Sequence, residues 1–319
     1  METKFEVHFW NLSNRARYHL GASFLKRLFD NAGAGDLRQL AKHIGVSYPY
    51  ISPLVRGVYS IPTNLLVKLA EKANIGLEEV EKNIVAVRTR HGKVCRLKFP
   101  ILPSASMASL IGHVFGDGYI GNKKRQFEYC NDNPNLLAEV KKHLRVAFGL
   151  EPMTERANRI GYSSIVGEIL VAFGSHVAPK VKSEKQIPEW IKSGPKEYKA
   201  SFLKALFDDD GSVLYSEGYN AKGVNFYQIR EKNILQKSHQ LLDEIKQLLQ
   251  EFEIFPGEPH LRKTYFSHGE EHAISYINIT NYKSILNFYS KIGLADGDKN
   301  NRLKKIVARR IHNNLGGNL

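Results

Sequence analysis

Two aspartates, each followed by glycine, stand at corresponding positions of two similar segments. Asp117 lies in ASLIGHVFGDGYI (residues 108–120), and Asp210 lies in SFLKALFDDDGSV (residues 201–213). If both segments are helices that pack side by side, their carboxylates meet at one point and repel each other unless a divalent cation lies between them. Oxygen ligands favour hard ions, above all Mg²⁺. Two such ions about 4 Å apart can activate a water molecule and stabilise the leaving oxygen of a phosphodiester. The pair therefore predicts metal-dependent phosphodiester hydrolysis.

Small residues recur along one face of each segment, which indicates that the two helices approach each other closely. At the spacing i, i+4 and i+8 stand Ala108, Gly112 and Gly116 in the first segment and Ser201, Ala205 and Asp209 in the second. Asp209 is a third acid near the expected interface, and we expect it either to be exposed at the helix end or to loosen the pairing. Asp208 is expected to be a structural residue of the helix end.

The chain from residue 100 onward repeats itself. LLAEVKK (136–142) is echoed by LLDEIKQ (241–247), and each copy has the pattern helix, two strands, helix, two strands, helix. This order lacks the alternation of a doubly wound fold and predicts an α+β architecture with antiparallel sheets. The expected strands are residues 119–121, 126–130, 152–155 and 160–165 in the first copy, and 212–215, 224–229, 260–266 and 273–279 in the second. A basic helix is expected at 299–312.

The first hundred residues read as helical. Ser13 could cap a helix through residues 27–29, and 36–57 followed by 61–74 has the spacing of short helices joined by a Gly-containing turn, with Ser47 able to cap the second. This is a helix-turn-helix pattern with residues 48–56 as the recognition helix. Pro53 would kink or shorten that helix. The alternative is an ordinary small helical bundle.

We expect four segments along the chain. Residues 1–81 form an all-α helix-turn-helix domain, 82–100 a basic linker, 101–190 the first repeat, and 191–319 the second repeat with the basic C-terminal helix. The linker either is only solvated or tracks a DNA backbone between two modules.

The net charge of +14, from 46 Lys and Arg against 32 Asp and Glu, predicts a polyanionic partner. The alternative is a basic surface that serves only solubility. The residues expected to contact DNA are Tyr48, Tyr50, Ser52, Arg56, Arg88, Arg90, Lys123, Lys124, Arg125, Gln126, Tyr227, Gln228, Arg230, Arg262 and Lys263. No apolar run approaches the length of a membrane helix, and the N-terminus does not read as a signal peptide. Cys95 and Cys130 have neither metal-ligand spacing nor a framework for disulfides, so we expect a cytoplasmic protein in a reducing compartment.

At the two acidic segments the sequence resembles a known family. LIGHVFGDG (110–118) and LKALFDDDG (203–211) resemble the paired signature of LAGLIDADG homing endonucleases in their single-chain, two-repeat form, and the resemblance covers about residues 100–312. His113 departs from it, because the family usually has an apolar residue there. The resemblance implies two pseudo-symmetric repeats whose saddle-shaped sheets read a long, nearly palindromic site in the DNA major groove. It also implies a monomer that makes a staggered double-strand break.

The resemblance implies roles for individual residues. Asp117 and Asp210 match the metal-binding acids of the family, with Gly116 and Asp209 beside them in the Mg²⁺ site. Family members also carry a lysine near each active centre. Lys185 in EKQIPEWI fits that position, and Lys299 in DGDKNNRL would be its partner. Each could polarise the hydrolytic water or offset charge on the transition-state phosphate; the alternative is a surface lysine that contacts a backbone phosphate.

Three functions fit these features. The first is a DNA-cleaving endonuclease with an added helix-turn-helix domain. The second is a regulator that joins the same two modules and does not cut. The third is an intron maturase that binds RNA on the same scaffold. Both aspartates favour the nuclease, because a regulator has no chemical need for paired carboxylates there.

Overall fold

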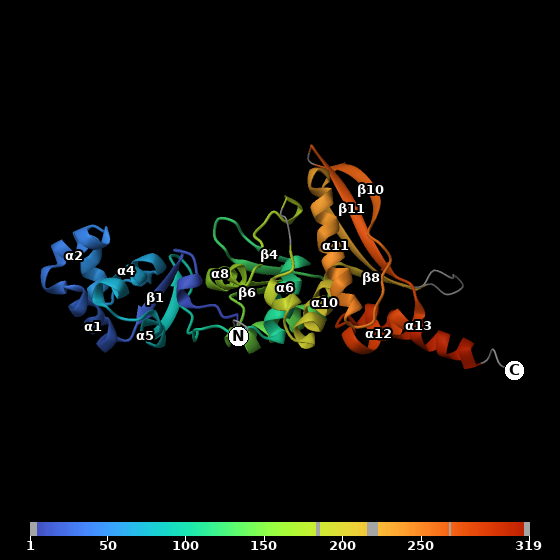
Figure 1. The fold of residues 1–319 in the computed structure, drawn as a ribbon, viewed down its shortest axis with the longest axis horizontal. Coiled ribbons are helices and arrows are strands. Elements are labelled where there is room, and N and C mark those ends of the chain that lie inside the picture. Colours follow the sequence, from blue (N-terminus) through green and yellow to red (C-terminus); the bar gives the residue numbers. More distant parts are fainter. Residues whose placement is uncertain (1–4, 183–185, 216–222, 268, 316–319) are drawn as a thin grey trace.

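The computed structural model describes residues 5–182, 186–215, 223–267 and 269–315, without the side chains of 234–238 and 310–315. The molecule is elongated, and its three sheets follow one another along its length in chain order (Figure 1). An N-terminal part occupies one end, a first four-stranded sheet lies in the middle, and a second lies at the other end. None of the described helices is both long and apolar enough to cross a membrane.

The N-terminal part is built on a small sheet as well as on helices. In chain order it contains η1 (Phe9–Asn11), β1 (Ala16–Leu20), α1 (Ala22–Ala32), η2 (Ala34–Asp36), α2 (Leu37–Ile44), α3 (Tyr48–Val55), β2 (Ile61–Pro62), α4 (Thr63–Ala73), α5 (Leu77–Lys82) and β3 (Ile84–Thr89). The sheet order is β2-β1-β3, and both pairings are antiparallel.

This sheet corrects three expectations. The N-terminal part is not all-α, no helix begins at Ser13, and residues 84–89 of the expected linker form a strand. The physical reason is visible in β1, where Ala16, Tyr18 and Leu20 are buried and the residues between them are half-buried. This alternation has the two-residue period of a β-strand. The two strand partners of β1, β2 and β3, lie more than forty and more than sixty residues further along the chain, so local signals do not reveal the pairing.

Helices α2 and α3 form where the helix-turn-helix pattern predicted two helices. Asp36 caps α2 by accepting hydrogen bonds from the backbone N–H groups of Arg38 and Gln39, and Gly45 ends it with a φ of +77°. Helix α3 has only eight residues and contains Pro53, which agrees with the expected shortening. Ser47 occupies the N-cap position without a side-chain cap hydrogen bond.

The rest of the chain has the repeated element order that the sequence predicted. The first copy consists of α6 (Ala105–Phe115), β4 (Gly118–Ile120), β5 (Phe127–Cys130), α7 (Pro134–Phe148), β6 (Thr154–Arg156), β7 (Arg159–Tyr162) and α8 (Ser164–Ala172), followed by η3 (Lys180–Lys182) and α9 (Glu189–Lys192). The second consists of α10 (Lys196–Asp210), β8 (Gly211–Leu214), β9 (Gly223–Glu231), η4 (Lys232–Ile234), α11 (Leu235–Gln250), β10 (His260–Ser267), β11 (Glu270–Ile279), α12 (Tyr282–Asn287), η5 (Phe288–Ile292) and α13 (Gly297–Leu315).

The two larger sheets share one topology. Their orders are β4-β5-β7-β6 and β8-β9-β11-β10, so in each the two central strands are the second and fourth of their copy, and all neighbours are antiparallel. The mixed α and β architecture with antiparallel sheets is therefore confirmed. Strand boundaries differ from the expected ones by up to three residues: the chain enters helix α8 at Ser164 instead of continuing the strand to residue 165, and β11 begins at Glu270 instead of residue 273.

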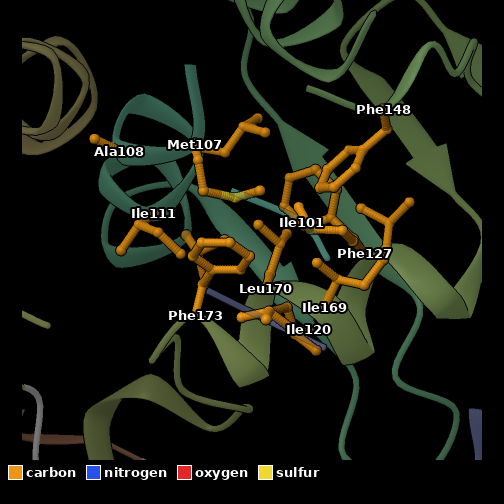
Figure 2. Packing of buried hydrophobic residues seen from close by; sticks show 14 of the residues in the cluster. Ile101, Met107, Ala108, Ile111, Ile120, Phe127, Phe148, Ile169, Leu170 and Phe173 are labelled. Atoms are coloured by element: carbon orange, nitrogen blue, oxygen red, sulfur yellow. The ribbon is translucent and has the colours of Figure 1, made fainter. Parts of the chain in front are cut away.

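Buried apolar side chains fill the space between the helices and the first sheet. Met107 and Ile111 of α6 pack with Phe127 of β5 and with Ile169 and Leu170 of α8 (Figure 2). All five are almost fully excluded from solvent. This packing fixes the end of α6, and with it the position of Asp117, relative to the sheet.

Candidate active site

Helices α6 and α10 lie side by side and approach closely at their small residues (Figure 1). A Cβ atom placed on Gly112 would stand 2.6 Å from the carbonyl oxygen of Phe202 and 2.9 Å from the Cβ of Ala205. A Cβ on Gly116 would collide with the Asp209 side chain. The predicted close approach of the two helices is therefore confirmed. It brings the C-terminal ends of both helices, and the aspartates there, to one place.

Helix α10 ends in three acids, an arrangement that the negative end of the helix dipole disfavours. Lys299 offsets this charge, because its Nζ donates to the backbone carbonyl oxygens of Phe207, Asp208 and Asp209. The three carboxylates themselves have different surroundings, and these surroundings separate their roles.

Asp208 is structural. Its buried carboxylate accepts hydrogen bonds of 2.9–3.0 Å from the backbone N–H groups of Ala295 and Asp296. Burial raises the pKa of Asp208 to about 6, although these two N–H groups oppose the shift. The expectation of a structural helix-end residue agrees with these contacts. Asp208 ties the end of α10 to the loop before α13.

The side chain of Asp209 is completely buried and joins the two repeats. Its carboxylate accepts hydrogen bonds from the Tyr129 hydroxyl at 2.7 Å and from the backbone N–H of Asp117 at 3.0 Å, and it lies 3.1 Å from His113 Nδ1. Burial alone would lower the pKa of His113, but the Asp209 carboxylate outweighs it and raises that pKa. The expectation that Asp209 is exposed was wrong, because its side chain is fully buried, and its hydrogen bonds run across the helix pair. The polar His113 in an otherwise apolar position supplies the matching donor.

Asp117 and Asp210 are the acids that remain partly accessible at the helix ends. Asn131 donates to Asp117 Oδ2 at 2.8 Å. Burial and the Asp209 charge raise the pKa of Asp117, while Lys180, Asn131 and Lys299 oppose this shift. Asp210 lines a cavity of about 230 Å³ together with Lys180 and Arg230.

Lys180 faces both aspartates, although the sequence had indicated Lys185. Burial lowers the pKa of Lys180, and the charges of Asp210, Asp117 and Asp209 oppose that shift. Lys185 lies outside the described residues. The sequence contains a signal for Lys180: it stands six positions after Gly174, and Lys299 stands six positions after Gly293. Both glycines have positive φ and follow the closing helical segment of their copy.

The oxygen donors at the two helix ends are suited to a hard cation. Mg²⁺ is usually held by one or two carboxylates, with water and substrate phosphate completing its octahedron. Asp117 and Asp210 supply that number, and the charges of Lys180 and Lys299 oppose the raised pKa of Asp117. Within the described residues, no three His, Cys, Asp or Glu side chains gather into a larger metal-binding group. The Asp209 carboxylate and the Gly116 Cα are packed against each other in the helix interface.

Several expected DNA-contacting residues are accessible. Tyr48 and Arg56 of the α3 region are exposed, while Tyr50 and Ser52 are half-buried, and the Tyr50 hydroxyl accepts a hydrogen bond from Arg17. Arg88 is half-buried and donates to the carbonyl oxygens of Thr89 and Arg90. Exposed or partly exposed side chains near the first sheet are Arg90, Lys123, Lys124 and Gln126, and Lys263 is exposed on β10.

Strand β9 separates the expected residues onto two faces. Tyr227 lies with Arg262 and Tyr276 in a groove of about 320 Å³, with the Arg262 guanidinium 5.3 Å from the Tyr227 ring. Gln228 and Arg230 are buried and share their face with Phe226, whose ring packs 5.4 Å from that of Phe207 in α10. Neighbouring residues of a strand point to opposite faces, so Tyr227 lies on one face of β9 while Gln228 and Arg230 lie on the other, and the contact of all three with DNA stays a prediction.

Arg125 also differs from the expectation. It is mostly buried, with its Nε 3.6 Å from Oε1 of the buried Glu168 in α8. This inward position makes Arg125 part of the packing between the first sheet and α8. Sequence reasoning missed Asn225, whose side chain donates to the Tyr227 hydroxyl at 2.8 Å on the open face of the second sheet.

Comparison with known proteins supports one part of this description directly. Residues 197–293, which include most of α10 and all four strands of the second sheet, match the family model of the LAGLIDADG-like domain. The chain is also similar to curated archaeal proteins. It is 27% identical to the replication factor C small subunit of Methanocaldococcus jannaschii, over 59% of this chain and 11% of that protein. It is 23% identical to the tRNA-splicing ligase RtcB of Methanopyrus kandleri, over 59% of this chain and 20% of that protein.

A third relative is the DNA-directed RNA polymerase subunit Rpo1N of Methanocaldococcus jannaschii, which is 27% identical over 70% of this chain and 18% of its own length. The chain thus spans a fifth or less of the length of these relatives. Among solved structures, the N-terminal LAGLIDADG domain of DUF199/WhiA matches 61% of this chain and 84% of its own, at 15% identity and a TM-score of 0.35.

Proposed function

We propose that the protein is a site-specific DNA endonuclease of the LAGLIDADG type that makes a staggered double-strand break. The observation that carries this proposal is the convergence of Asp117 and Asp210 at the ends of the paired helices α6 and α10, with Lys180 facing both. Each of the two repeats supplies one acid, as cleavage of two strands requires. The enzyme acts as a monomer, because one chain supplies both acids.

The residues of the site divide the work. Asp117 and Asp210 hold a divalent cation, for which Mg²⁺ is the best fit; when bound, it lowers the pKa of a water molecule and stabilises charge on the phosphate oxygens. Lys180 offsets the negative charge that grows on the scissile phosphate. Lys299 neutralises the carbonyl end of α10, from which Asp210 projects, by donating to the carbonyl oxygens of that helix end. Asn131 orients the carboxylate of Asp117.

DNA recognition falls to surfaces on either side of this site. The two sheets, which share one strand order, form a saddle over a long and nearly palindromic duplex site. On the second sheet, Tyr227 and Arg262 stand on the open face and can contact base edges or phosphates, and the buried Asn225 holds the Tyr227 hydroxyl. The N-terminal part adds the exposed side chains of α3, with Tyr48 and Arg56 as its DNA contacts. The net charge of +14 favours such a polyanion.

The named activities of the curated relatives are not transferred to this chain. The relatives have different activities, since they are a replication factor small subunit, a tRNA-splicing ligase and an RNA polymerase subunit. Each of them matches this chain over only a small share of the relative's own length. We propose that each of these relatives contains a segment that is independent of its named activity, and that this chain is similar to that segment.

A regulator that binds DNA without cutting is the second candidate. The asymmetry of the two helix ends favours it, because Asp209 and His113 have no counterpart at the matching positions Gly116 and Leu206. The buried contacts of Asp209 would serve a purely structural helix pair equally well. The two functions make the same predictions for DNA binding and differ only in strand cleavage.

Cleavage and binding by the full chain distinguish the candidates. A randomised duplex library is incubated with the protein and Mg²⁺, and the new ends are sequenced to identify the site. On that duplex, Asp117→Asn and Asp210→Asn should each abolish double-strand cleavage and retain binding in Ca²⁺, because Asn keeps the shape and loses the charge. Wild-type protein that selects a site but never cuts it would establish the regulator. Preferential binding of structured RNA over duplex DNA would establish the maturase.

A further inference from the structure

A large cavity lies at the junction of the N-terminal part and the first sheet. It has a volume of about 760 Å³, within the range of ligand-binding pockets. One wall comes from β1 and from the segment after β3, and the other comes from the turn between β4 and β5 and from the start of α8. We call it the junction cavity. Its basic side chains are Arg15, Arg17, Arg90, Lys123 and Lys124.

The charge of the junction cavity is one-sided. Each wall contributes lysine or arginine, and no aspartate or glutamate is among the lining residues, all of which are described. Arg15 has the carboxylate of Glu168 as a neighbour, but the other four cations gather around the same space and repel each other, which an anion in the cavity would relieve. Asn14, Gln126 and Ser164 also line the cavity and add neutral hydrogen-bonding partners. This composition is suited to phosphate groups.

The two walls are fixed to each other by buried contacts. Glu168 of α8 is only 3% exposed and accepts a hydrogen bond of 2.7 Å from the Ser13 hydroxyl of the N-terminal part. Its Oε1 lies 3.8 Å from Arg15 Nε and 3.6 Å from Arg125 Nε. Arg15 also donates to the backbone carbonyl oxygen of Lys123 across the junction. The cavity is therefore held open by the fold itself, which lowers the entropic cost of binding a ligand there.

The junction cavity lies between the two surfaces that the proposed function assigns to DNA. On one side Arg17 donates to the hydroxyl of Tyr50 in α3. On the other side Gln126 immediately precedes β5 of the first sheet. A duplex that contacts both α3 and the first sheet passes this point, and a backbone phosphate there meets cations from both walls.

We propose that the junction cavity binds the sugar–phosphate backbone of the same duplex that lies on the first sheet. This inference rests on the proposed function and deepens it. With the backbone bound in the junction cavity, the N-terminal part and the sheets read one continuous DNA site instead of two independent ones. Because phosphate contacts set the register of a protein on DNA, the cavity fixes the spacing between the bases read by α3 and those read by the sheet.

The test compares variants of the full chain on a random-sequence duplex of about 40 base pairs, over a range of salt concentrations. Lys123→Ala with Lys124→Ala removes two cations from one wall, and Arg90→Ala removes one from the other. The control is Lys68→Ala with Lys72→Ala, which removes the same charge from exposed positions of α4 outside the cavity. Unchanged thermal unfolding shows that each variant is folded.

Each phosphate contact contributes about 0.9 to the slope of log affinity against log salt. We expect the Lys123 and Lys124 double variant to reduce the slope by about 2 and the affinity by roughly tenfold, while the control changes the slope by less than about 0.5. Arg90→Ala should reduce it by about 1. Inorganic phosphate and adenosine monophosphate serve as separate probes, and we expect neither to bind below millimolar concentration, since one phosphate gains only a fraction of the contacts.

Failures of the two proposals are distinguishable. In one outcome, wild-type protein binds duplex with a steep slope of log affinity against log salt, and the cavity variants and the control lose the same amount of affinity and slope. Phosphate contact is then not concentrated at the junction, and this inference is overturned. Micromolar binding of adenosine monophosphate that the cavity variants abolish, with no loss of duplex affinity, would assign the cavity to a free nucleotide and also overturn it. If wild-type protein fails to bind duplex at all, the proposed function fails.

Discussion

The carboxylate of Asp209 accepts a hydrogen bond of 3.0 Å from the backbone N–H of Asp117, across the interface of the two paired helices. An acid of the second repeat thus holds the backbone of the catalytic acid proposed for the first. The same carboxylate is bonded by Tyr129 and contacted by His113. These contacts link the packing of the helix pair to the position of Asp117.

Replacing Asp209 with alanine should destabilise the protein strongly. It leaves the Tyr129 hydroxyl, the His113 ring and the Asp117 N–H buried without their acceptor, so we expect a loss of about 3 kcal/mol in the free energy of unfolding. Urea denaturation measures it. The control Glu155→Ala removes an exposed carboxylate paired with Lys141 and should cost less than about 1 kcal/mol. Equal losses would contradict the role assigned to Asp209.

The helix pair should not tolerate a methyl group at Gly112. In an isolated helix Gly→Ala is stabilising by about 1 kcal/mol, but here the new Cβ would stand 2.6 Å from the Phe202 carbonyl oxygen. We expect a net loss of about 2 kcal/mol or more in unfolding free energy, measured by urea denaturation. Gly21→Ala is the control, because the nearest atom to its new Cβ is 3.9 Å away. A stabilised Gly112→Ala variant would show that the helices do not pack as described.

Lys180 and Lys185 should differ in their effect on cleavage. Lys180→Met should slow strand cleavage by about 100-fold at saturating Mg²⁺, since Lys180 faces both Asp117 and Asp210. Lys185→Met is the matched comparison, and we expect it to change the single-turnover rate less than about threefold. The reverse order of effects would restore the assignment made from the sequence.

His143 should make the protein sensitive to acid. Burial and the neighbouring His113 lower its pKa to about 4 from an ordinary value of 6.5, so the folded state favours the neutral ring. The stability that this provides is full above pH 6.5 and is lost as the pH falls through 4, by roughly 3 kcal/mol at most. His143→Gln should flatten the dependence of unfolding free energy on pH in that window. If the unfolding free energy of His143→Gln changed between pH 7 and pH 4.5 by as much as that of wild type, this role of His143 would be contradicted.

The exposed side chains of α3 should affect binding and leave the chemistry unchanged. Tyr48→Ala with Arg56→Ala should weaken affinity for the selected duplex by about tenfold, and the single-turnover cleavage rate at saturating protein should stay within about twofold of wild type. Fluorescence anisotropy gives the affinity. Lys26→Ala, whose ammonium pairs with Asp30 on α1, is the control. An unaltered affinity would remove the N-terminal part from DNA recognition.

The repeated architecture could be predicted because its signals are local. The segments 136–142 and 241–247 show the apolar periodicity of a helix within seven residues. In the strands, apolar and polar residues alternate over a similarly short stretch. The three strands of the N-terminal part were missed for the opposite reason. β1 has five residues, and its pairing with β3 spans the whole of α1 to α5, so its signal lies in a distant segment.

The sequence by itself determined the paired aspartates Asp117 and Asp210, the small residues that let their helices meet, and the basic charge, because residue type and spacing along a helix are enough for each. Only the tertiary structure decided which of the three acids of α10 stay accessible. Asp208 and Asp209 are taken up by donors from the α12–α13 region and from the first repeat, respectively, and neither donor is close in sequence. The same is true of Lys180 and of Arg125, since burial and electrostatic partners depend on which distant segments the fold brings together.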